Sequence, residues 1–413
     1  RRDRTLHQSW PVGTPEARRA LEPRDDVLEE QIESVDGDSV TFAQHNGPFT
    51  TYRRTVVGGP ATVDETIRYR LVIPWFGWLF ARPMRGTLRH RPRDGLKPWW
   101  SPPDLLTQRH VAILGLLAAA SMAAAFANTL FTQTASFAAD GFGIDERGQG
   151  VGGVVVRLGV VIAIPFALLA DRRGRRMMII VTAWVAPLWC VLGAIAPNFW
   201  VLVGTQAIGR PVGLALALLI GVVAAEEMPR NSRAYALSVL ALAGGLGAAV
   251  AVLALRLADL GREGWRLVYL LSLIWLLPAI SLTRHLPETH RFEQRHAIAP
   301  RLDRRRFAII AIVAISANLF VAPASFFQNR YLDDVRGYTG GGIALFTICT
   351  ATPASLGLIA GGRIADMVGR RAVLAICMRL STMLLVGTFA FGGTTMWLLA
   401  LVGGLLAGAA YPA

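Results

Sequence analysis

The chain has 413 residues, of which 53% are hydrophobic and only 17% are charged, with a formal net charge of +14. Soluble domains carry about 25% charged residues, so this composition excludes an ordinary soluble protein for most of the chain. The positive charge does not indicate a nucleic-acid partner, because the arginines cluster at the ends of apolar runs, where membrane topology explains them.

Residues 1–96 are polar and predict a small soluble α+β region. The segments "SVTFAQ" and "FTTYRRTVV" alternate in the manner of strands around Asn46-Gly47, a strong hairpin signal, and "TVDETIRYRLVIP" predicts another strand. The run "WFGWLF" (75–80) is too short to span a membrane and fits a core helix or an interfacial segment. Residues 97–108, rich in Trp and Pro, form a linker suited to the membrane–water interface.

Apolar runs of about 20 residues recur after the linker, and this length crosses a bilayer core. They predict an all-α polytopic membrane protein: a first bundle of six spans at 109–284, a central loop at 285–305 and an incomplete second bundle at 306–413. The ten expected spans are 109–131, 150–170, 177–196, 200–222, 234–257, 266–284, 306–327, 338–360, 372–392 and 394–413.

The arginine-rich loops predict the orientation. The loops "DRRGRR" (171–176) and "DMVGRR" (366–371) fall on the same side of the expected membrane as "EEMPRNSR" and the central loop. The positive-inside rule makes this side cytoplasmic. The chain is therefore expected to be a multi-pass protein of the cytoplasmic membrane, with residues 1–96 in the cytoplasm.

An internal repeat relates the two bundles. "TASFAADGFGID" follows the first span and "PASFFQNRYLDD" follows the seventh, each at nearly the same distance after Asn128 or Asn318. Each half then reaches an Asp-x-x-Gly-Arg-Arg loop after its second span. Matches in the same order and topology indicate parallel repeats, a transporter plan that places the solute site between the halves near the membrane midplane.

The two charged loops are candidate gating elements. The glycines permit a sharp turn, and the arginines suit anionic headgroups of membrane lipid, but the acids have no topological use. Each acid either caps the following helix or pairs with a neighbouring arginine, and a pair present in only one conformation would act as a latch. The candidate gating residues are Asp171, Gly174, Arg175, Arg176, Asp366, Gly369, Arg370 and Arg371.

At these loops the sequence resembles the major facilitator superfamily, whose signature reads Gly-x-Leu-Ala-Asp-Arg-x-Gly-Arg-Arg. "GRIADMVGRR" departs from it at Ile364 and Met367, and "ALLADRRGRR" departs at Ala167. The resemblance covers residues 109–413 and is greatest to actinobacterial drug-efflux-like members. It implies a twelve-span transporter that works by alternating access, with these loops gating the cytoplasmic side and two spans beyond the ten seen here.

Two departures leave the antiporter branch of this family unassigned. The arginine of the family's fourth-span motif falls on Thr205, and Arg210 comes after the glycine on which the motifs align. The glycine-rich run "LAGGLGAAVAVLA" (242–254) lacks the proline of the family's fifth-span Gly-Pro pair.

Polar residues inside the expected spans are candidates for solute binding. An arginine deep in a span costs about 2.5–3.5 kcal/mol on insertion scales, so it usually faces a cavity or a partner. Mid-span Asp and Glu are absent from the ten expected spans, which favours an anionic or neutral solute. For the amides the alternative is a helix–helix hydrogen bond, and for Arg157 it is snorkelling. The candidate set is Arg210, Arg157, Gln206, Asn128, Gln133, Asn318 and Gln328.

These features favour a secondary active transporter for a small organic solute, with efflux and uptake both open. They do not indicate an enzyme, a cofactor or a metal, because zinc-site spacings and phosphate loops are absent from the sequence. The alternative is a membrane-tethered module in which residues 1–96, which resemble the end of a START-like helix-grip domain, bind a lipid or another hydrophobic ligand. The sequence leaves the oligomeric state open.

Overall fold

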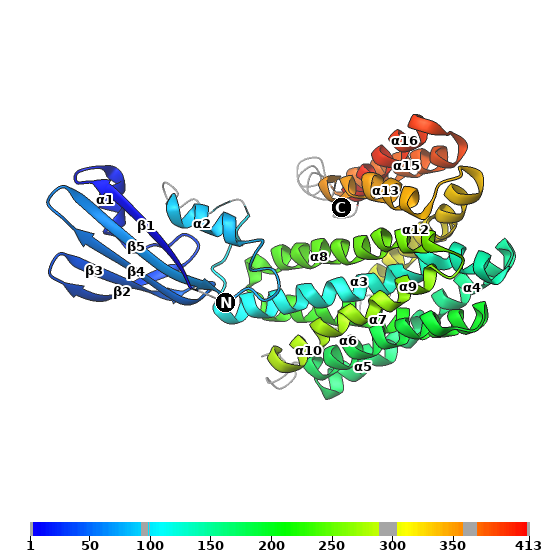
Figure 1. Cartoon of the computed structure of the whole chain (residues 1–413), viewed down its shortest axis with the longest axis horizontal. Coiled ribbons are helices and arrows are strands. Elements are labelled where there is room, and N and C mark those ends of the chain that lie inside the picture. Colours follow the sequence, from blue (N-terminus) through cyan, green and yellow to red (C-terminus); the bar gives the residue numbers. More distant parts are fainter. Residues whose placement is uncertain (1–2, 92–97, 99, 289–303, 358–369, 411–413) are drawn as a thin grey trace.

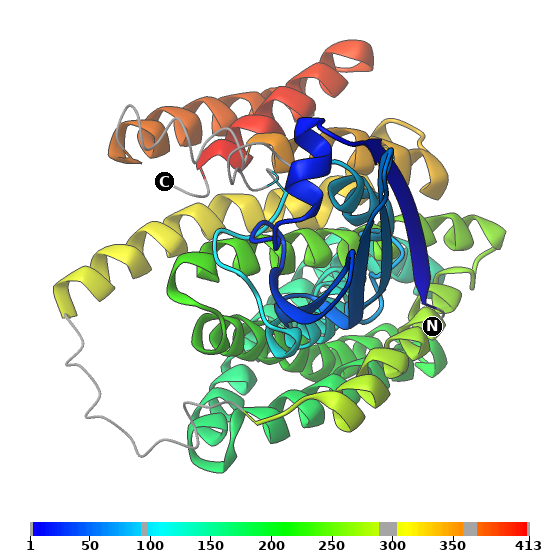
Figure 2. The same ribbon diagram turned by 90° about the vertical axis from the view of Figure 1, so that its left-hand side faces the viewer.

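The computed structural model describes residues 3–91, 98, 100–288, 304–357 and 370–410. A β-sheet lies at one end of the long axis, and a large assembly of helices makes up the rest of the molecule (Figure 1). Viewed from that end, the strands stand in front of the helices that follow them in the chain (Figure 2).

The sheet is antiparallel throughout, and its five strands lie in the order β1-β5-β4-β3-β2. The predicted Asn-Gly hairpin joins β3 to β4, and the third predicted strand is β5. The strands are β1 (Arg4–Pro11), β2 (Glu29–Asp36), β3 (Ser39–Asn46), β4 (Phe49–Gly58) and β5 (Thr62–Leu71). The short helix α1 (Pro15–Ala20) follows β1, and α2 (Ala81–Arg89) follows the sheet.

A buried ion network lies inside this N-terminal region. Arg54 on β4 pairs with Glu30 on β2 at 2.6 Å and with Glu65 on β5 at 3.0 Å. Its guanidinium also lies 4.1 Å from the ring centroid of Phe42. Such a network is tolerated inside a protein because each charge has partners that replace its lost hydration.

The run "WFGWLF" forms consecutive turns and not a helix. Trp75 has a positive φ of 60°, and Trp78 is 73% exposed. The preceding Pro74 lies so close to Gly115 on the first long helix that a Cβ there would come within 2.6 Å of the proline Cδ. The segment is therefore tied to the helical part, with apolar side chains left on its surface.

The first half of the helical part begins at a capped residue, because Thr107 accepts a hydrogen bond from the His110 backbone N–H. Its elements are α3 (Gln108–Phe142), α4 (Glu146–Leu158), η2 (Gly159–Ile162), α5 (Ala163–Arg173), α6 (Arg175–Val191), η3 (Leu192–Ile195), α7 (Phe199–Glu227), η4 (Arg230–Ser232), α8 (Arg233–Leu253), η5 (Ala254–Leu260), α9 (Trp265–Leu270), η6 (Leu271–Trp275) and α10 (Leu276–His285).

The second half contains fewer described elements. They are α12 (Arg304–Arg330), the π-helical turn η7 (Tyr331–Val335), α13 (Gly340–Ala351), α15 (Arg370–Ala390) and α16 (Gly393–Ala410).

Eight helical runs within the described residues are long and apolar enough to cross a membrane. They coincide with eight of the ten expected spans. The expected spans 306–327 and 338–360 fall on α12 and α13, which are not among the eight, and residues 358–360 lie outside the described residues. The count of ten spans and the division into two six-span bundles therefore stay predictions.

The first helix is longer than expected. The sequence predicts an end near residue 131, but α3 continues to Phe142 because the intervening residues include no proline or glycine before Gly141. It stops at Gly143, whose φ of 71° is readily adopted by glycine. The repeated segment "TASFAAD" therefore belongs to the last turns of α3, and its counterpart "PASFF" lies in the last turns of α12.

Candidate functional site

The two intramembrane arginines lie on neighbouring helices that approach very closely. Arg157 is near the end of α4, and Arg210 is near the middle of α7. Where α4 passes into η2, a Cβ on Gly159 would come within 2.4 Å of the Ala207 carbonyl oxygen and 3.1 Å of Pro211. Glycine permits this approach, and the charges of Arg157 and Arg210 are thereby close enough to act on one another.

Each arginine reaches toward a further helix. The Arg210 Nε donates a hydrogen bond of 3.2 Å to the backbone carbonyl of Asn128 on α3. The Arg157 guanidinium lies 5.8 Å from the ring centroid of Phe326 on α12, in the second half of the chain. Both side chains are partly exposed. Within the described part of the chain, neither arginine has an ion pair with a carboxylate, so their positive charge is available to an anionic group.

Of the amide residues predicted for the site, one lies beside Arg210 and two make hydrogen bonds elsewhere. Asn128 lies beside Arg210, as described above. Gln206 is fully buried, and its Nε2 donates to the Cys190 carbonyl of α6 at 3.4 Å. This is the helix–helix hydrogen bond that was expected as the alternative to solute binding. Gln133 accepts from Asn329 Nδ2 through both its backbone and its side-chain oxygen, at 2.7 and 2.9 Å.

Two further amides lie on α12. Gln328 is partly buried in the last turn of this helix, just before η7 continues the run. Asn318 is on the same helix, but its side chain lies outside the described part of the structure.

The first charged loop forms the turn between α5 and α6. Gly174 adopts φ 100° and ψ 143°, a conformation that glycine tolerates and other residues rarely adopt. Asp171 is exposed and lies 3.5 Å from Arg175, four residues ahead, while α6 begins without a side-chain cap. Of the two roles expected for the acid, the structure shows pairing with an arginine. Arg175 makes a closer pair, 2.8 Å, with Glu226 at the end of α7.

The remaining arginine of this loop binds the end of α10. The Arg176 Nε donates to the Leu286 carbonyl at 2.6 Å, and its backbone N–H donates to Glu288 Oε1 at 3.2 Å. Arg109, at the start of α3, donates to the Glu288 carbonyl at 3.0 Å. The loop, the start of α3 and the end of α10 therefore meet at one end of the molecule, the end that carries the sheet.

Most of the second charged loop lies outside the described residues. Asp366 and Gly369 lie outside the described residues, as does the side chain of Arg370, and Arg371 is exposed at the start of α15. The equivalence of the two loops in gating stays a prediction.

An ion network at the opposite end joins the two halves and was not among the predicted site residues. Arg330, at the end of α12, lies 3.3 Å from Asp140 of α3 and 3.8 Å from Glu146 of α4, and it donates to Gln149 Oε1 at 2.8 Å. It also pairs within its own half with Asp334 at 3.0 Å. An acid near a helix C-terminus, such as Asp140, is unfavourable alone, and Arg330 supplies the compensating charge.

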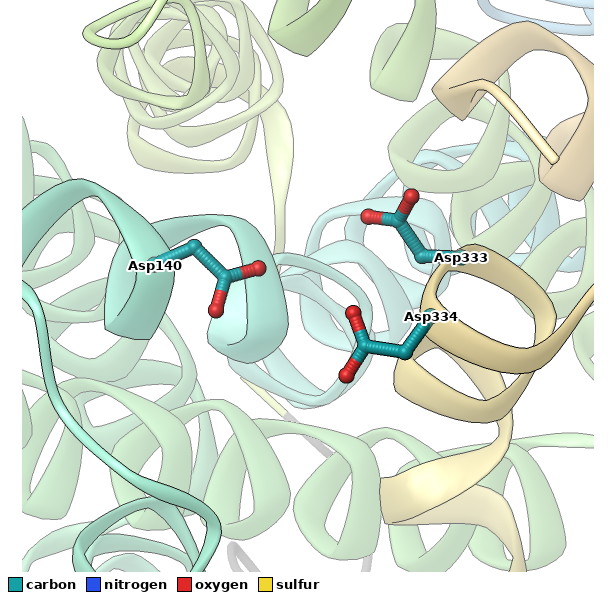
Figure 3. A group of neighbouring side chains, drawn as sticks. All are labelled: Asp140, Asp333 and Asp334. Carbon is teal, nitrogen blue, oxygen red and sulfur yellow. The ribbon is translucent and has the colours of Figure 1, made fainter. Parts of the chain in front are cut away.

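Three carboxylates of this network come very close together. Oxygens of Asp140, Asp333 and Asp334 lie within 4.8 Å of one another, with Asp140 on α3 facing the two acids of η7 (Figure 3). This spacing would suit a cation. The ion pairs that Arg330 makes with Asp140 and Asp334 already neutralise part of that charge, so the arrangement is explained as an inter-half ion network.

Further contacts at this end reinforce the connection. Asp259 of η5 accepts from the backbone N–H groups of Gly340 and Gly341, at 2.7 and 2.9 Å, at the start of α13. The rings of Phe131 and Phe326, from the corresponding helices of the two halves, lie 5.9 Å apart. The segments that repeat in the sequence are therefore brought together at the interface between the halves.

Comparison with known proteins assigns the helical part to a family. The sequence model of the Major Facilitator Superfamily matches residues 115–413. No curated protein matches the chain.

Among solved structures, the chain is similar to a bacterial homologue of the human lysosomal transporter Spinster, in an inward-facing and unoccupied conformation. The TM-score is 0.58 with 19% identity, covering 73% of this chain and 74% of that one. It is also similar to a point mutant of the nucleoside transporter NupG, with a TM-score of 0.58 and 14% identity, 73% and 80% covered. The xylose transporter XylE from E. coli, in a partially occluded inward-open conformation, gives a TM-score of 0.56 with 17% identity, 74% and 83% covered.

These matches do not favour the alternative in which residues 1–96 carry the main activity, because the family match begins at residue 115. They also give no support to efflux in particular, since the sugar and nucleoside transporters among the neighbours are not described as efflux proteins.

Proposed function

The chain belongs to the major facilitator superfamily and is a multi-pass membrane protein, and on this premise we propose that it is a secondary active transporter of a small organic anion. In this proposal the solute binds between the two halves, and alternating opening at either end of the molecule carries it across the cytoplasmic membrane. Arg210 and Arg157 bind its carboxylate or phosphate group.

The observation that carries the substrate class is the pair of neighbouring arginines, one of which, Arg157, lies against Phe326 of the second half. Arg210 lies eleven residues after Phe199, or about 16 Å along α7, too deep for its guanidinium to reach headgroups easily. Only one of its nitrogens is engaged with the protein among the described contacts, through the Asn128 carbonyl. Two positive charges without a carboxylate partner in the described residues favour an anion, because a bound anion offsets their desolvation.

Alternating access is supported by the contacts between the halves. The network around Arg330, the Asp259 contacts and the Phe131–Phe326 pair hold the end away from the sheet together. This arrangement fits a conformation closed at that end. Opening the site there requires these contacts to separate, which makes Arg330 the proposed gate on that side.

The orientation also belongs to this proposal. The first charged loop and the N-terminal region lie at the same end, since Arg176 and Trp75 both contact α10 near its end, at Thr283 and Ser281. The positive-inside rule places this end in the cytoplasm, so the Arg330 network faces the outside.

Thermal stability of the purified full chain tests the substrate class. The chain is heated with carboxylates, organic phosphates, neutral sugars and nucleosides, and each stabilising compound is then assayed for uptake into proteoliposomes. A ligand that binds only the folded state raises the unfolding midpoint, so anionic compounds are expected to raise it. Stabilisation and uptake of neutral compounds alone would contradict the proposal.

A further inference from the structure

An apolar cavity lies outside the proposed solute site. It has a volume of about 210 Å³ and lies between the segment after the sheet, the first turns of α3 and the first four turns of α8. Phe76 and Phe80 line one wall, Leu114 and Ala118 of α3 another, and Ala243 of α8 a third. The segment after the sheet and these two helices therefore leave a space between them.

The chemistry of this cavity excludes water as a stable occupant. Nearly all of its lining is carbon, and its polar rim residues are engaged elsewhere. Asp26 pairs with Arg24 at 2.7 Å, Asp104 accepts from Ser232 at 3.2 Å, and the Tyr235 hydroxyl donates to the Trp100 carbonyl. A water needs about two to four polar partners, and apolar cavities of about 150 Å³ stay dry and take apolar ligands.

The cavity opens toward the hydrocarbon of the bilayer. Leu242 and Leu246 line it and are also exposed on α8, about 14 and 20 Å along that helix from its start at Arg233. Leu79 lines the opposite side and is exposed as well. In a chain that spans the membrane, side chains at this depth on a helix surface meet acyl chains.

Exposed arginines stand close in the sequence to lining residues on two of the elements that form the cavity. Arg82 and Arg85 are exposed on α2, on either side of Met84, which is buried and lines the cavity. On the other wall, Arg233 is exposed at the start of α8, two residues before the lining residue Tyr235. Basic clusters beside transmembrane helices attract anionic lipids, by about 1 kcal/mol per arginine near the surface.

From these observations we propose that the cavity is a binding site for an acidic phospholipid of the bilayer, with one acyl chain inserted between the N-terminal region and α3 and α8. The phosphate of this lipid lies near Arg82, Arg85 and Arg233. The site is separate from Arg157 and Arg210, and it does not depend on the identity of the transported solute.

Photocrosslinking of the full chain in nanodiscs tests this proposal. The probe is phosphatidylglycerol with a diazirine in one acyl chain, and crosslinked peptides are identified by mass spectrometry. Crosslinks are expected in the peptides that contain residues 76–84 and 235–246. Ala243→Phe fills the cavity and is expected to lower this crosslinking at least about fivefold, whereas Ala241→Phe, on the exposed face of the same helix, leaves it unchanged.

A second variant keeps the test decisive if Ala243→Phe disturbs folding. Arg82→Gln together with Arg85→Gln changes only exposed side chains, so insertion is retained. It is expected to reduce the preference for phosphatidylglycerol over a phosphatidylcholine probe about tenfold. Equal crosslinking in Ala243→Phe and Ala241→Phe proteins, an unchanged headgroup preference in the double variant, or crosslinks spread evenly over the helices would overturn the proposal.

Discussion

Substitution of Arg330 by Gln tests whether the network at the end away from the sheet, which is the outer end in the proposed orientation, holds the two halves together. Among its cross-half partners, Gln149 is fully buried, while Asp140 and Glu146 are 45% and 76% exposed as side chains. A hydrogen bond to a charged group contributes about 1.5–3 kcal/mol, and partly exposed ion pairs contribute about 0–1 kcal/mol each. The free energy that favours the closed outer end is therefore expected to fall by about 2 kcal/mol. This corresponds to a roughly thirtyfold lower ratio of closed to open outer ends.

Distances between the outer ends of the two halves measure this ratio. The native cysteines are replaced by alanine, and spin labels are attached at Arg147→Cys in the first half and Thr395→Cys in the second. Double electron–electron resonance then measures the distance between the labels, which increases when the outer end opens. Both positions are exposed. The Arg330→Gln protein is expected to populate longer distances in nanodiscs.

Arg336→Gln serves as the matched control. This arginine is at the same end, but its hydrogen bonds go to Tyr331 and Phe391 within the second half. It is expected to leave the distance distribution unchanged. If the Arg330→Gln distribution matched that of the unsubstituted protein, the network would not be a gate.

Three further predictions concern other parts of the molecule. Asp171→Asn is expected to slow transport at equal surface expression, because an acid contributes little to membrane topology and is proposed to act as a latch. Wild-type transport rates would show that Asp171 is not a latch. Burial, and then the neighbouring carboxylates of Asp334 and Asp140, raise the pKa of Asp333. The ionised form of Asp333 is therefore disfavoured while the outer end is closed. The fraction of molecules open at this end is expected to increase as the pH rises above the ordinary pKa range of a carboxyl group. Spin-label distances that are constant over this pH range would refute that coupling. Arg54→Met leaves Glu30 as a buried, uncompensated charge and is expected to destabilise the sheet by about 3–5 kcal/mol, seen as faster proteolysis within residues 1–91. Unchanged protection from protease would contradict it.

The sheet shows which strands alternation can predict. The central strands β3, β4 and β5 were expected, because apolar side chains alternate where one face packs on a core. The missed strands β1 and β2 are the two edges of the sheet. Seven of the eight residues of β2 are exposed, so the strand carries little apolar pattern to detect.

The sequence located the eight helical runs of the described residues that are long and apolar enough to span a membrane, but not their ends. A run of about 20 apolar residues can satisfy its backbone hydrogen bonds in a bilayer only by forming a helix. This constraint locates the membrane spans without information on tertiary structure. The extension of α3 to Phe142 was missed because its final turns mix small and polar residues, which look like a loop in a hydropathy pattern.

The candidate site was predicted in part for similar reasons. The cost of burying a charge singles out Arg157 and Arg210 from sequence alone. Their proximity depends on the contact between Gly159 and Ala207, which only the fold reveals. Arg330 was overlooked because its partners Asp140 and Gln149 lie far away in the sequence, although the repeated segment before it marked the same place.

The affinity of a stabilising organic anion for folded Arg210→Gln protein tests the central claim most directly. Losing a charged hydrogen bond costs about 1.5–3 kcal/mol, so the account predicts at least about a tenfold weaker affinity, with Arg210→Lys, which keeps the charge without the planar fork, in between. Arg379→Gln is the matched control, because Arg379 is an exposed arginine within α15. An affinity equal to that of the unsubstituted protein, with only the stability lowered, would show that Arg210 joins helices through the Asn128 carbonyl and does not bind the solute.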